Sequence, residues 1–204
     1  RRLVGDENDY GYITTYHGFC VKVLREDINK IQYPKQFVIM DVEDQKSILR
    51  EVFNELGLNQ KVFTFKQVLR FISREKSNLG YLSYILESKK LETPNELDKV
   101  FFKYLEKQQR NFALDFDDLL NYTLYIFSKN QDVLEKWQKR LHYIQVDETQ
   151  DSSEKQFMLI EKLSNFHKNL FVVGDPDQTI YEWRGAKPEI LVDFDKQFPS
   201  AQTI

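Results

Sequence analysis

The 204-residue sequence has one cysteine, Cys20, and three histidines. This small number of cysteines and histidines excludes a disulfide framework and a cysteine-rich zinc module, so the stability of the fold must come from packing. The single cysteine also indicates a reducing compartment. No run reaches the roughly 18 to 20 consecutive apolar residues of a membrane span, and no signal-peptide pattern opens the chain. The charges nearly balance, with 29 Lys+Arg against 32 Asp+Glu, which excludes a histone-like polycation. We therefore expect a cytoplasmic protein.

Apolar residues are plentiful, at 41% hydrophobic and 14% aromatic, and they are sufficient to build a core. The length suits one domain or two unequal lobes. Residues 60–110 hold 11 Lys/Arg and 6 Asp/Glu, whereas residues 140–204 hold 7 and 11. This uneven charge favours two lobes, a basic middle and an acidic C-terminal third.

The middle of the chain has the sequence signals of helix starts. Thr64 with Gln67, and Thr93 with Glu96, both fit a capping box, in which a threonine hydroxyl and a side chain three residues later satisfy free helix amides. Apolar residues at helical spacing follow each start. Two earlier helices are expected over Phe19–Ile28 and from after Asp41 to Leu56, with Gly57 as the stop.

The two ends of the chain have short β-type runs instead. These runs are Ile13-Thr14-Thr15, Tyr143-Ile144-Gln145-Val146, Leu170-Phe171-Val172-Val173 and Gln202-Thr203-Ile204. Helical patterns beginning near Ser153 and Pro188 separate the last three, and strands that alternate with helices indicate a parallel sheet. We predict an α/β protein, with an incomplete α/β lobe from residues 1–30 and 112–204 and an inserted all-helical lobe over 31–111.

Asp147 and Glu148 follow a predicted buried strand. In open parallel sheets, ligands bind beyond the carboxyl ends of the strands. One carboxylate there could hold the Mg²⁺ of a nucleotide while its neighbour orients or deprotonates the attacking water. An ordinary acidic turn is the alternative for this dipeptide.

A second candidate site follows the run that ends at Val173. The amide of Gln178 could bond a terminal phosphate or its attacking water. Tyr181, Trp183 and Arg184 offer two rings and a guanidinium plane, which are the groups that stack on nucleobases. Aromatic residues that pack in a core are the alternative.

Thr15 and His17 lie where a predicted strand gives way to a helix. Amides at a helix start favour anions, so these two side chains could contact a nucleic-acid phosphate. Cys20 is expected in the core. Asp115, Asp117 and Asp118 suit the start of a helix, where capping is the simplest interpretation.

Four segments carry a more specific signal when they are taken in order. They are Thr15-Tyr16-His17-Gly18-Phe19-Cys20, Leu114-Asp115-Phe116-Asp117-Asp118-Leu119, Tyr143-Ile144-Gln145-Val146-Asp147-Glu148-Thr149-Gln150-Asp151 and Val173-Gly174-Asp175-Pro176-Asp177-Gln178-Thr179-Ile180-Tyr181-Glu182-Trp183-Arg184-Gly185-Ala186. Together they resemble successive motifs of the UvrD/Rep/PcrA-type superfamily 1 DNA helicases.

The resemblance implies an ATP- and Mg²⁺-dependent enzyme that moves 3′-to-5′ on single-stranded DNA and unwinds duplex DNA. Residues 1–30 and 112–204 would be part of its RecA-like lobe 1A, and residues 31–111 its helical subdomain 1B. The implied metal ligand is Asp147 and the implied catalytic residues are Glu148 and Gln178, all three at the nucleotide. The implied DNA contacts are Thr15, His17, Tyr181, Trp183 and Arg184.

The sequence departs from the family pattern in places. Thr149 stands where an aromatic residue is usual, Gly18 where serine is common, and Glu182 where a basic residue is frequent. Because a carboxylate repels phosphate, Glu182 argues against a backbone contact at that position.

The 204 residues contain no Gly-x-x-x-x-Gly-Lys-[Ser/Thr] phosphate loop. In a family member this loop would lie upstream of Arg1, so we expect an internal fragment that is itself inactive and whose partners are DNA and the remaining helicase lobes. An uncovered sheet edge would favour self-association. Two alternatives remain: a non-catalytic nucleic-acid-binding module, and the core of a helicase–nuclease or phage-defence protein.

Overall fold

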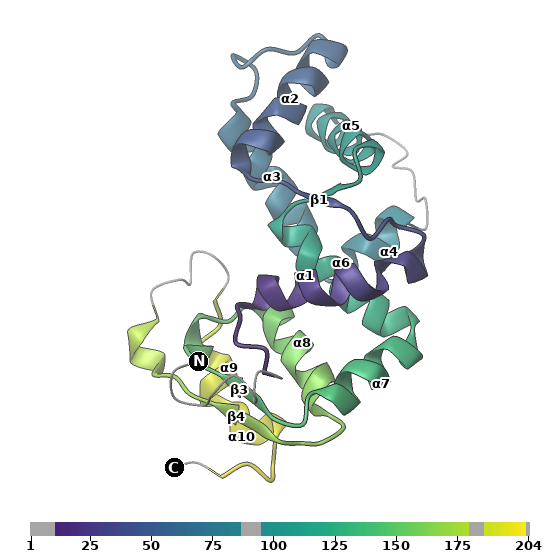
Figure 1. The fold of residues 1–204 in the computed structure, drawn as a ribbon. Coiled ribbons are helices and arrows are strands. Elements are labelled where there is room, and N and C mark those ends of the chain that lie inside the picture. The colour runs from purple at the N-terminus through teal and green to yellow at the C-terminus, as the bar shows by residue number, and fades with distance from the viewer. Residues whose placement is uncertain (1–10, 87–94, 180–185, 203–204) are drawn as a thin grey trace, which may run out of the picture. The chain divides into compact units, whose positions relative to one another are not determined.

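The computed structural model describes residues 11–86, 95–179 and 186–202, which form two compact units divided between Thr123 and Leu124 (Figure 1). Among these residues, no helix is both long and apolar enough to cross a membrane. The structure is rich in helices and holds two small parallel sheets. The predicted α/β class is confirmed at this level. The RecA-like lobe and the inserted subdomain over 31–111 stay predictions.

Helices dominate the first unit. It contains α1 (Tyr16–Asp27), the short 3-10 helix η2 (Ile28–Ile31), β1 (Val38–Ile39), α2 (Val42–Leu56), α3 (Phe65–Ser77), α4 (Tyr81–Leu86), α5 (Glu96–Arg110), β2 (Ala113–Leu114) and the start of α6 (Phe116–Lys129). Helix α6 crosses the boundary between the units in the sequence.

Two predicted helices begin where their sequence signals indicate, and one of them also ends at its predicted stop. Asp41 accepts from the amides of the first turn of α2, and Gly57 ends that helix with a φ of 66°. Thr64 and Gln67 form the capping box of α3, with the Thr64 backbone amide donating to Gln67 Oε1 at 2.9 Å. Both predictions are confirmed because local hydrogen bonds decide them.

Other local predictions are wrong. The capping residue of α5 is Asn95, which pairs with Asp98, so Glu96 is the first residue of the helix and cannot close a box with Thr93. Thr93 itself lies outside the described residues. Residues 13–15 form no strand: Thr15 is extended but caps α1, which starts at Tyr16 rather than Phe19 because the Thr15 hydroxyl accepts from the amide of Gly18.

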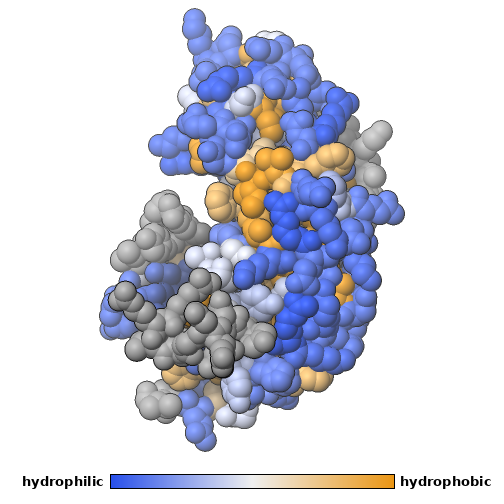
Figure 2. All heavy atoms as spheres, in the orientation of Figure 1, coloured by the Kyte–Doolittle hydropathy of each residue, from blue (hydrophilic) through white to orange (hydrophobic). Residues whose placement is uncertain are grey.

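The core of the first unit lies between α2, α3 and α5. Its buried apolar side chains include Leu49, Val52, Val68, Ile72 and Val100. The two strands were not predicted from the sequence. They pair in parallel as Val38↔Ala113 and Ile39↔Leu114. Val38 and Ile39 are exposed, and Figure 2 shows a hydrophobic area of the surface where Figure 1 draws β1.

The second unit alternates strands with helices. It contains α7 (Gln131–Arg140), β3 (Ile144–Val146), the 3-10 helix η3 (Thr149–Asp151), α8 (Glu154–Ser164), β4 (Leu170–Val172), the 3-10 helix η4 (Pro176–Gln178), α9 (Glu189–Val192) and α10 (Phe194–Gln197). Strands β3 and β4 pair in parallel with Val146 opposite Val172, which confirms both predicted strands.

Helix α8 confirms the helical pattern after Ser153, which caps it. The pattern after Pro188 forms two short helices, α9 and α10, which are separated by Asp193. At the chain end, Gln202 has no regular structure, and Thr203 and Ile204 lie outside the described residues. The predicted strand at 202–204 is therefore not found in its described part.

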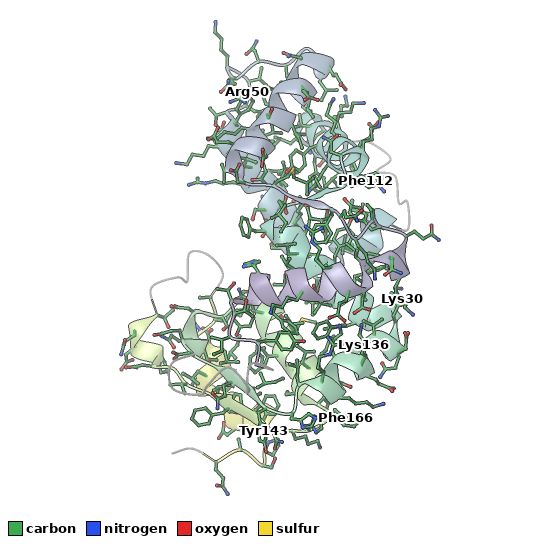
Figure 3. The ribbon with its side chains drawn as sticks, viewed as in Figure 1. Lys30, Arg50, Phe112, Lys136, Tyr143 and Phe166 are labelled. Carbon is green, nitrogen blue, oxygen red and sulfur yellow. The ribbon has the colours of Figure 1, made fainter. Side chains whose placement is uncertain are left out.

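The core of the second unit is centred on the contact between α7 and α8. Trp137 is fully buried, and Leu159 and Leu163 are buried on α8. The exposed aromatics Tyr143 and Phe166 lie near the amino ends of β3 and β4, at the end of the sheet away from the acidic loops (Figure 3).

Candidate functional site

Two loops leave the carboxyl ends of β3 and β4 and are joined by backbone hydrogen bonds. The amide of Val173 donates to the carbonyl of Val146 at 2.8 Å, and the amide of Thr149 donates to the carbonyl of Val173 at 3.0 Å. The parallel pairing thus continues one step past each strand. It holds the segment after Val146 beside the segment after Val172.

Asp147 and Glu148 are exposed directly after β3. The amide of Glu148 donates to Oδ1 of Asp147 at 2.9 Å. Glu148 has a left-handed backbone, with a φ of 52°. Non-glycine residues adopt this conformation at a cost and are concentrated at functional sites, where surrounding contacts hold them.

Gln150 supplies those contacts. Its side chain is 1% exposed. Its Nε2 donates to Oε2 of Glu148 at 2.7 Å, and its Oε1 accepts from the amide of Asp175 at 3.1 Å. One buried amide therefore fixes the Glu148 carboxylate and the loop after β4 at once. The sequence motif contained Gln150 but gave no signal of this role.

Gly174 lets the two loops approach each other. A Cβ at this position would lie 2.4 Å from Oε1 of Gln150, 3.0 Å from Cδ2 of Leu191 and 3.2 Å from the amide nitrogen of Thr149. These separations are too short for an ordinary contact, so any larger residue would displace the Gln150 side chain.

Gln178 lies in the neighbouring loop, on the 3-10 helix η4. Its Nε2 donates to Oδ2 of Asp175 at 2.8 Å, while Oδ1 of Asp175 accepts from the amide of Asp177 at 3.0 Å. Asp175 thus caps η4 and directs the Gln178 amide. The structure brings the loops that carry Asp147, Glu148 and Gln178 together at one edge of the β3–β4 sheet.

Thr15 and His17 belong to the first unit, at the start of α1. The Thr15 hydroxyl accepts from the amide of Gly18 at 3.2 Å. The His17 ring packs edge-to-face against Phe116, with the ring centroids 5.4 Å apart. Burial lowers the pKa of His17, against the opposing effect of Asp117, so the imidazole is neutral near pH 7.

Phe116 is a candidate that the sequence interpretation missed, because its segment was assigned to helix capping. It is the first residue of α6 and is 54% exposed although it touches His17. An exposed ring beside an imidazole offers a face to a planar ligand.

Three predicted contacts, Tyr181, Trp183 and Arg184, lie outside the described residues. The chain returns at Ala186, which forms an antiparallel bridge with Ser153 next to η3. In the second unit, the described members of the candidate site are Asp147, Glu148, Gln150, Asp175 and Gln178.

The second unit has the strand–helix alternation of an α/β protein, and its acidic and amide side chains lie beyond the carboxyl ends of parallel strands, the place where open α/β sheets bind ligands. The family of the UvrD/REP helicase N-terminal domain matches residues 2–199, and the chain belongs to that family.

Curated relatives agree with this assignment. The chain is 36% identical over 204 residues to the ATP-dependent DNA helicase PcrA of Staphylococcus aureus strain Mu50, a match that covers 100% of the chain and 28% of that protein. It is 36% identical over 214 residues to the ATP-dependent DNA helicase PcrA of Staphylococcus epidermidis strain RP62A, covering 99% of the chain and 28% of the relative. The chain thus spans just over a quarter of the length of these relatives.

Proposed function

We propose that the chain is part of an ATP-dependent DNA helicase that moves 3′-to-5′ on single-stranded DNA and unwinds duplex DNA. Family membership and the relatives named PcrA support this activity. The observation that carries the proposal is the Gln150 side chain, which joins the Glu148 carboxylate to the loop of Gln178.

The donor set fits a magnesium nucleotide. Asp147 is exposed, and its Oδ1 accepts a hydrogen bond from the amide of Glu148. Its Oδ2 would bind the metal ion. Hard carboxylate oxygens are the ligands that Mg²⁺ prefers. Asp147 would hold the ion, and the Mg²⁺-bound ATP would supply the phosphoryl group that is transferred to water.

Glu148 would orient and deprotonate the attacking water. Its carboxylate is fixed at one oxygen by Gln150, so the other oxygen can accept a proton. Gln178 would bond the terminal phosphate, and its present bond to Asp175 is the contact that it would exchange on binding. Release of the Gln178–Asp175 contact would couple nucleotide binding to the segment after Gln178, which carries the proposed DNA contacts.

Single-stranded DNA would be held by stacking and by phosphate contacts. Tyr181, Trp183 and Arg184 follow Gln178 in the sequence and suit base stacking. In the first unit, Phe116 would stack on a base, with His17 behind it and Thr15 at the helix start near a phosphate. The partners would be DNA and further lobes of the same protein, in the cytoplasm.

Two alternative functions would use the same residues differently. In a non-catalytic nucleic-acid-binding module, the basic 60–110 segment and the aromatic cluster would bind DNA without turnover. A helicase–nuclease or phage-defence protein would use the same core. Self-association through the exposed strand β1, where Val38 is 55% exposed, is a separate prediction.

The decisive experiment is Glu148→Gln in the complete protein. Loss of a positioned base should lower ATP turnover by about 10² to 10⁴ and leave nucleotide affinity unchanged. Asp147→Ala should instead weaken magnesium-dependent nucleotide binding. Steady-state ATPase with a nucleotide-binding assay measures both, and Glu161→Gln on α8 is the matched control. Wild-type turnover in Glu148→Gln would favour the non-catalytic module.

A further inference from the structure

Lys76 lies fully buried on α3, which is unusual for a lysine. Its Nζ donates to Oδ2 of Asp115 at 2.6 Å and to Oδ2 of Asp118 at 2.7 Å. Both carboxylates are themselves buried, at 2% exposure each. A third partner is Oε1 of Gln108, at 3.1 Å.

Side chains from two further helices complete this cluster. Gln45 of α2 donates to Oδ2 of Asp115 at 3.1 Å, and the Tyr104 hydroxyl of α5 donates to the same oxygen at 3.4 Å. Gln108 of α5 also donates to Asp118. The Lys76 cluster, defined as Gln45, Lys76, Tyr104, Gln108, Asp115 and Asp118, therefore joins α2, α3 and α5 to the start of α6.

The cluster fixes the first turn of α6. The amide of Asp118 donates to Oδ1 of Asp115 at 3.0 Å, and the amide of Asp115 donates to Oδ2 of Asp118 at 3.1 Å. Because both carboxylates serve as caps and as partners of Lys76, the turn cannot shift without breaking a buried ion pair.

Phe116 lies inside this turn, between the two carboxylates. It points outward, 54% exposed, with its ring centroid 5.4 Å from that of His17. The backbone that carries the exposed ring is thus fixed by the buried pairing of Asp115 and Asp118 with Lys76, which lies on α3, 40 residues before Phe116 in the sequence.

We propose that Lys76 is a positioning residue for single-stranded DNA binding: through Asp115 and Asp118 it holds Phe116 against His17, and so links α2, α3 and α5 to the surface that stacks on a base. This inference rests on the proposed function, in which Phe116 contacts DNA. Nothing in the charge pattern of the sequence separated Lys76 from the other basic residues of its segment.

The test is a double-mutant cycle in the complete protein, with a fluorescein-labelled oligothymidylate as the probe in anisotropy titrations. Phe116→Ala should weaken binding by about 5- to 150-fold, the loss expected for one base stack. Lys76→Met should weaken it by a comparable factor. In the Phe116→Ala background, Lys76→Met should add less than about 2-fold, because residues that act through one another are not additive.

Lys107→Met is the matched control. Lys107 is a lysine of α5 that pairs with Glu51 and Glu55 at the surface, outside the Lys76 cluster. The control should leave the affinity within about 2-fold of wild type, since one distant phosphate-attracting charge contributes little at moderate salt. If Lys76→Met does not fold, Asp118→Asn replaces it in the same double-mutant cycle. Asp118→Asn keeps Lys76 and its ion pair with Asp115.

Additive losses in the cycle would overturn the inference, as would wild-type affinity in Lys76→Met or an equal loss in Lys107→Met. If Phe116→Ala still weakens binding, any of these three outcomes overturns only the inference about Lys76 and leaves the proposed function intact. A wild-type protein without affinity for the oligonucleotide would instead overturn the proposed function, and the inference with it.

Discussion

The side-chain carbonyl of Gln150 accepts a hydrogen bond from the backbone amide of Asp175 at 3.1 Å. This contact crosses from the loop after β3 to the loop after β4. Because the Gln150 amide also holds Glu148, the position of a proposed catalytic carboxylate depends on the loop that carries Gln178.

We therefore expect Gln150→Leu to impair catalysis without removing any proposed catalytic group. The leucine leaves the Asp175 amide and the Glu148 carboxylate without their shared partner, and a displacement of about 1 Å can cost on the order of 10² in rate. ATP turnover of the complete protein should fall accordingly while nucleotide affinity changes little. Gln145→Leu, at an exposed position on β3, is the control. Unchanged turnover in Gln150→Leu would contradict the coupling.

Gly174→Ala tests the close approach of the loops. The added methyl would meet Gln150 Oε1 at 2.4 Å and Leu191 Cδ2 at 3.0 Å, so neighbouring side chains must move. Overpacking of this kind costs typically about 1 to 3 kcal/mol of folding free energy. Gly80→Ala is the matched control, because a Cβ there meets nothing within 4 Å. Urea unfolding of the 204-residue chain compares the stabilities of Gly174→Ala and Gly80→Ala. Equal stabilities would show that the two loops can move apart without a cost in folding free energy.

Features decided by nearby residues could be predicted from the sequence. Helices begin after Asp41, Thr64 and Ser153 as expected, and each of these residues caps its helix, since a cap needs only a side-chain oxygen and an amide two or three residues on. The apolar runs before Asp147 and Gly174 form parallel strands as expected. The prediction at Thr93 was wrong because Asn95 caps the same helix, and the strand at residues 13–15 was wrong because Thr15 caps α1 instead.

Features decided by distant residues could not be predicted. Lys76 is one of 11 basic residues in the 60–110 segment, and only its pairing with Asp115 and Asp118 buries it. The acids at the start of α6 were correctly expected to cap the helix, but their second role needs a partner from α3. Gln150 likewise gains its role from Asp175, 25 residues further along.

The Lys76 cluster predicts how stability depends on pH. Burial and the charge of Asp115 raise the pKa of Asp118 to about 7, whereas the charge and hydrogen bonds of Lys76 outweigh burial and lower the pKa of Asp115. An aspartate in an unfolded chain titrates near pH 4. Between pH 4 and 7 the folded state therefore keeps a proton on Asp118 that the unfolded chain has lost, and this group's stabilisation declines as pH rises.

Asp118→Asn should remove that decline, because asparagine is neutral at every pH. The slope of unfolding free energy against pH should become more positive in the variant, by up to about 1.4 kcal/mol per pH unit between pH 4 and 7. The lowered pKa of His17 acts in the opposite sense in both proteins, since its stabilisation increases as pH rises. The difference between the two profiles cancels the His17 contribution and leaves the change at Asp118 and its hydrogen-bonded neighbour Asp115. Urea unfolding at several pH values measures it. Parallel profiles would mean that Asp118 is ionised throughout this range.

The last prediction separates stacking from charge in the segment after Gln178. Trp183→Ala should weaken single-stranded DNA binding by about 1 to 3 kcal/mol with little sequence preference, because every base has a ring face. The salt dependence should stay as in wild type, since a neutral ring releases no counterions. Arg184→Ala should also weaken binding, but it should flatten the plot of log affinity against log salt by roughly 0.7, the slope lost with one single-strand phosphate contact.

Anisotropy titrations of the complete protein at several salt concentrations distinguish the two effects, with Tyr181→Ala expected to behave like Trp183→Ala. Each variant should first unfold at the wild-type denaturant midpoint. A midpoint lowered in Trp183→Ala with no change in DNA affinity would assign the ring to the core. A salt slope unchanged in Arg184→Ala would remove the phosphate contact and leave the guanidinium as a stacking plane alone.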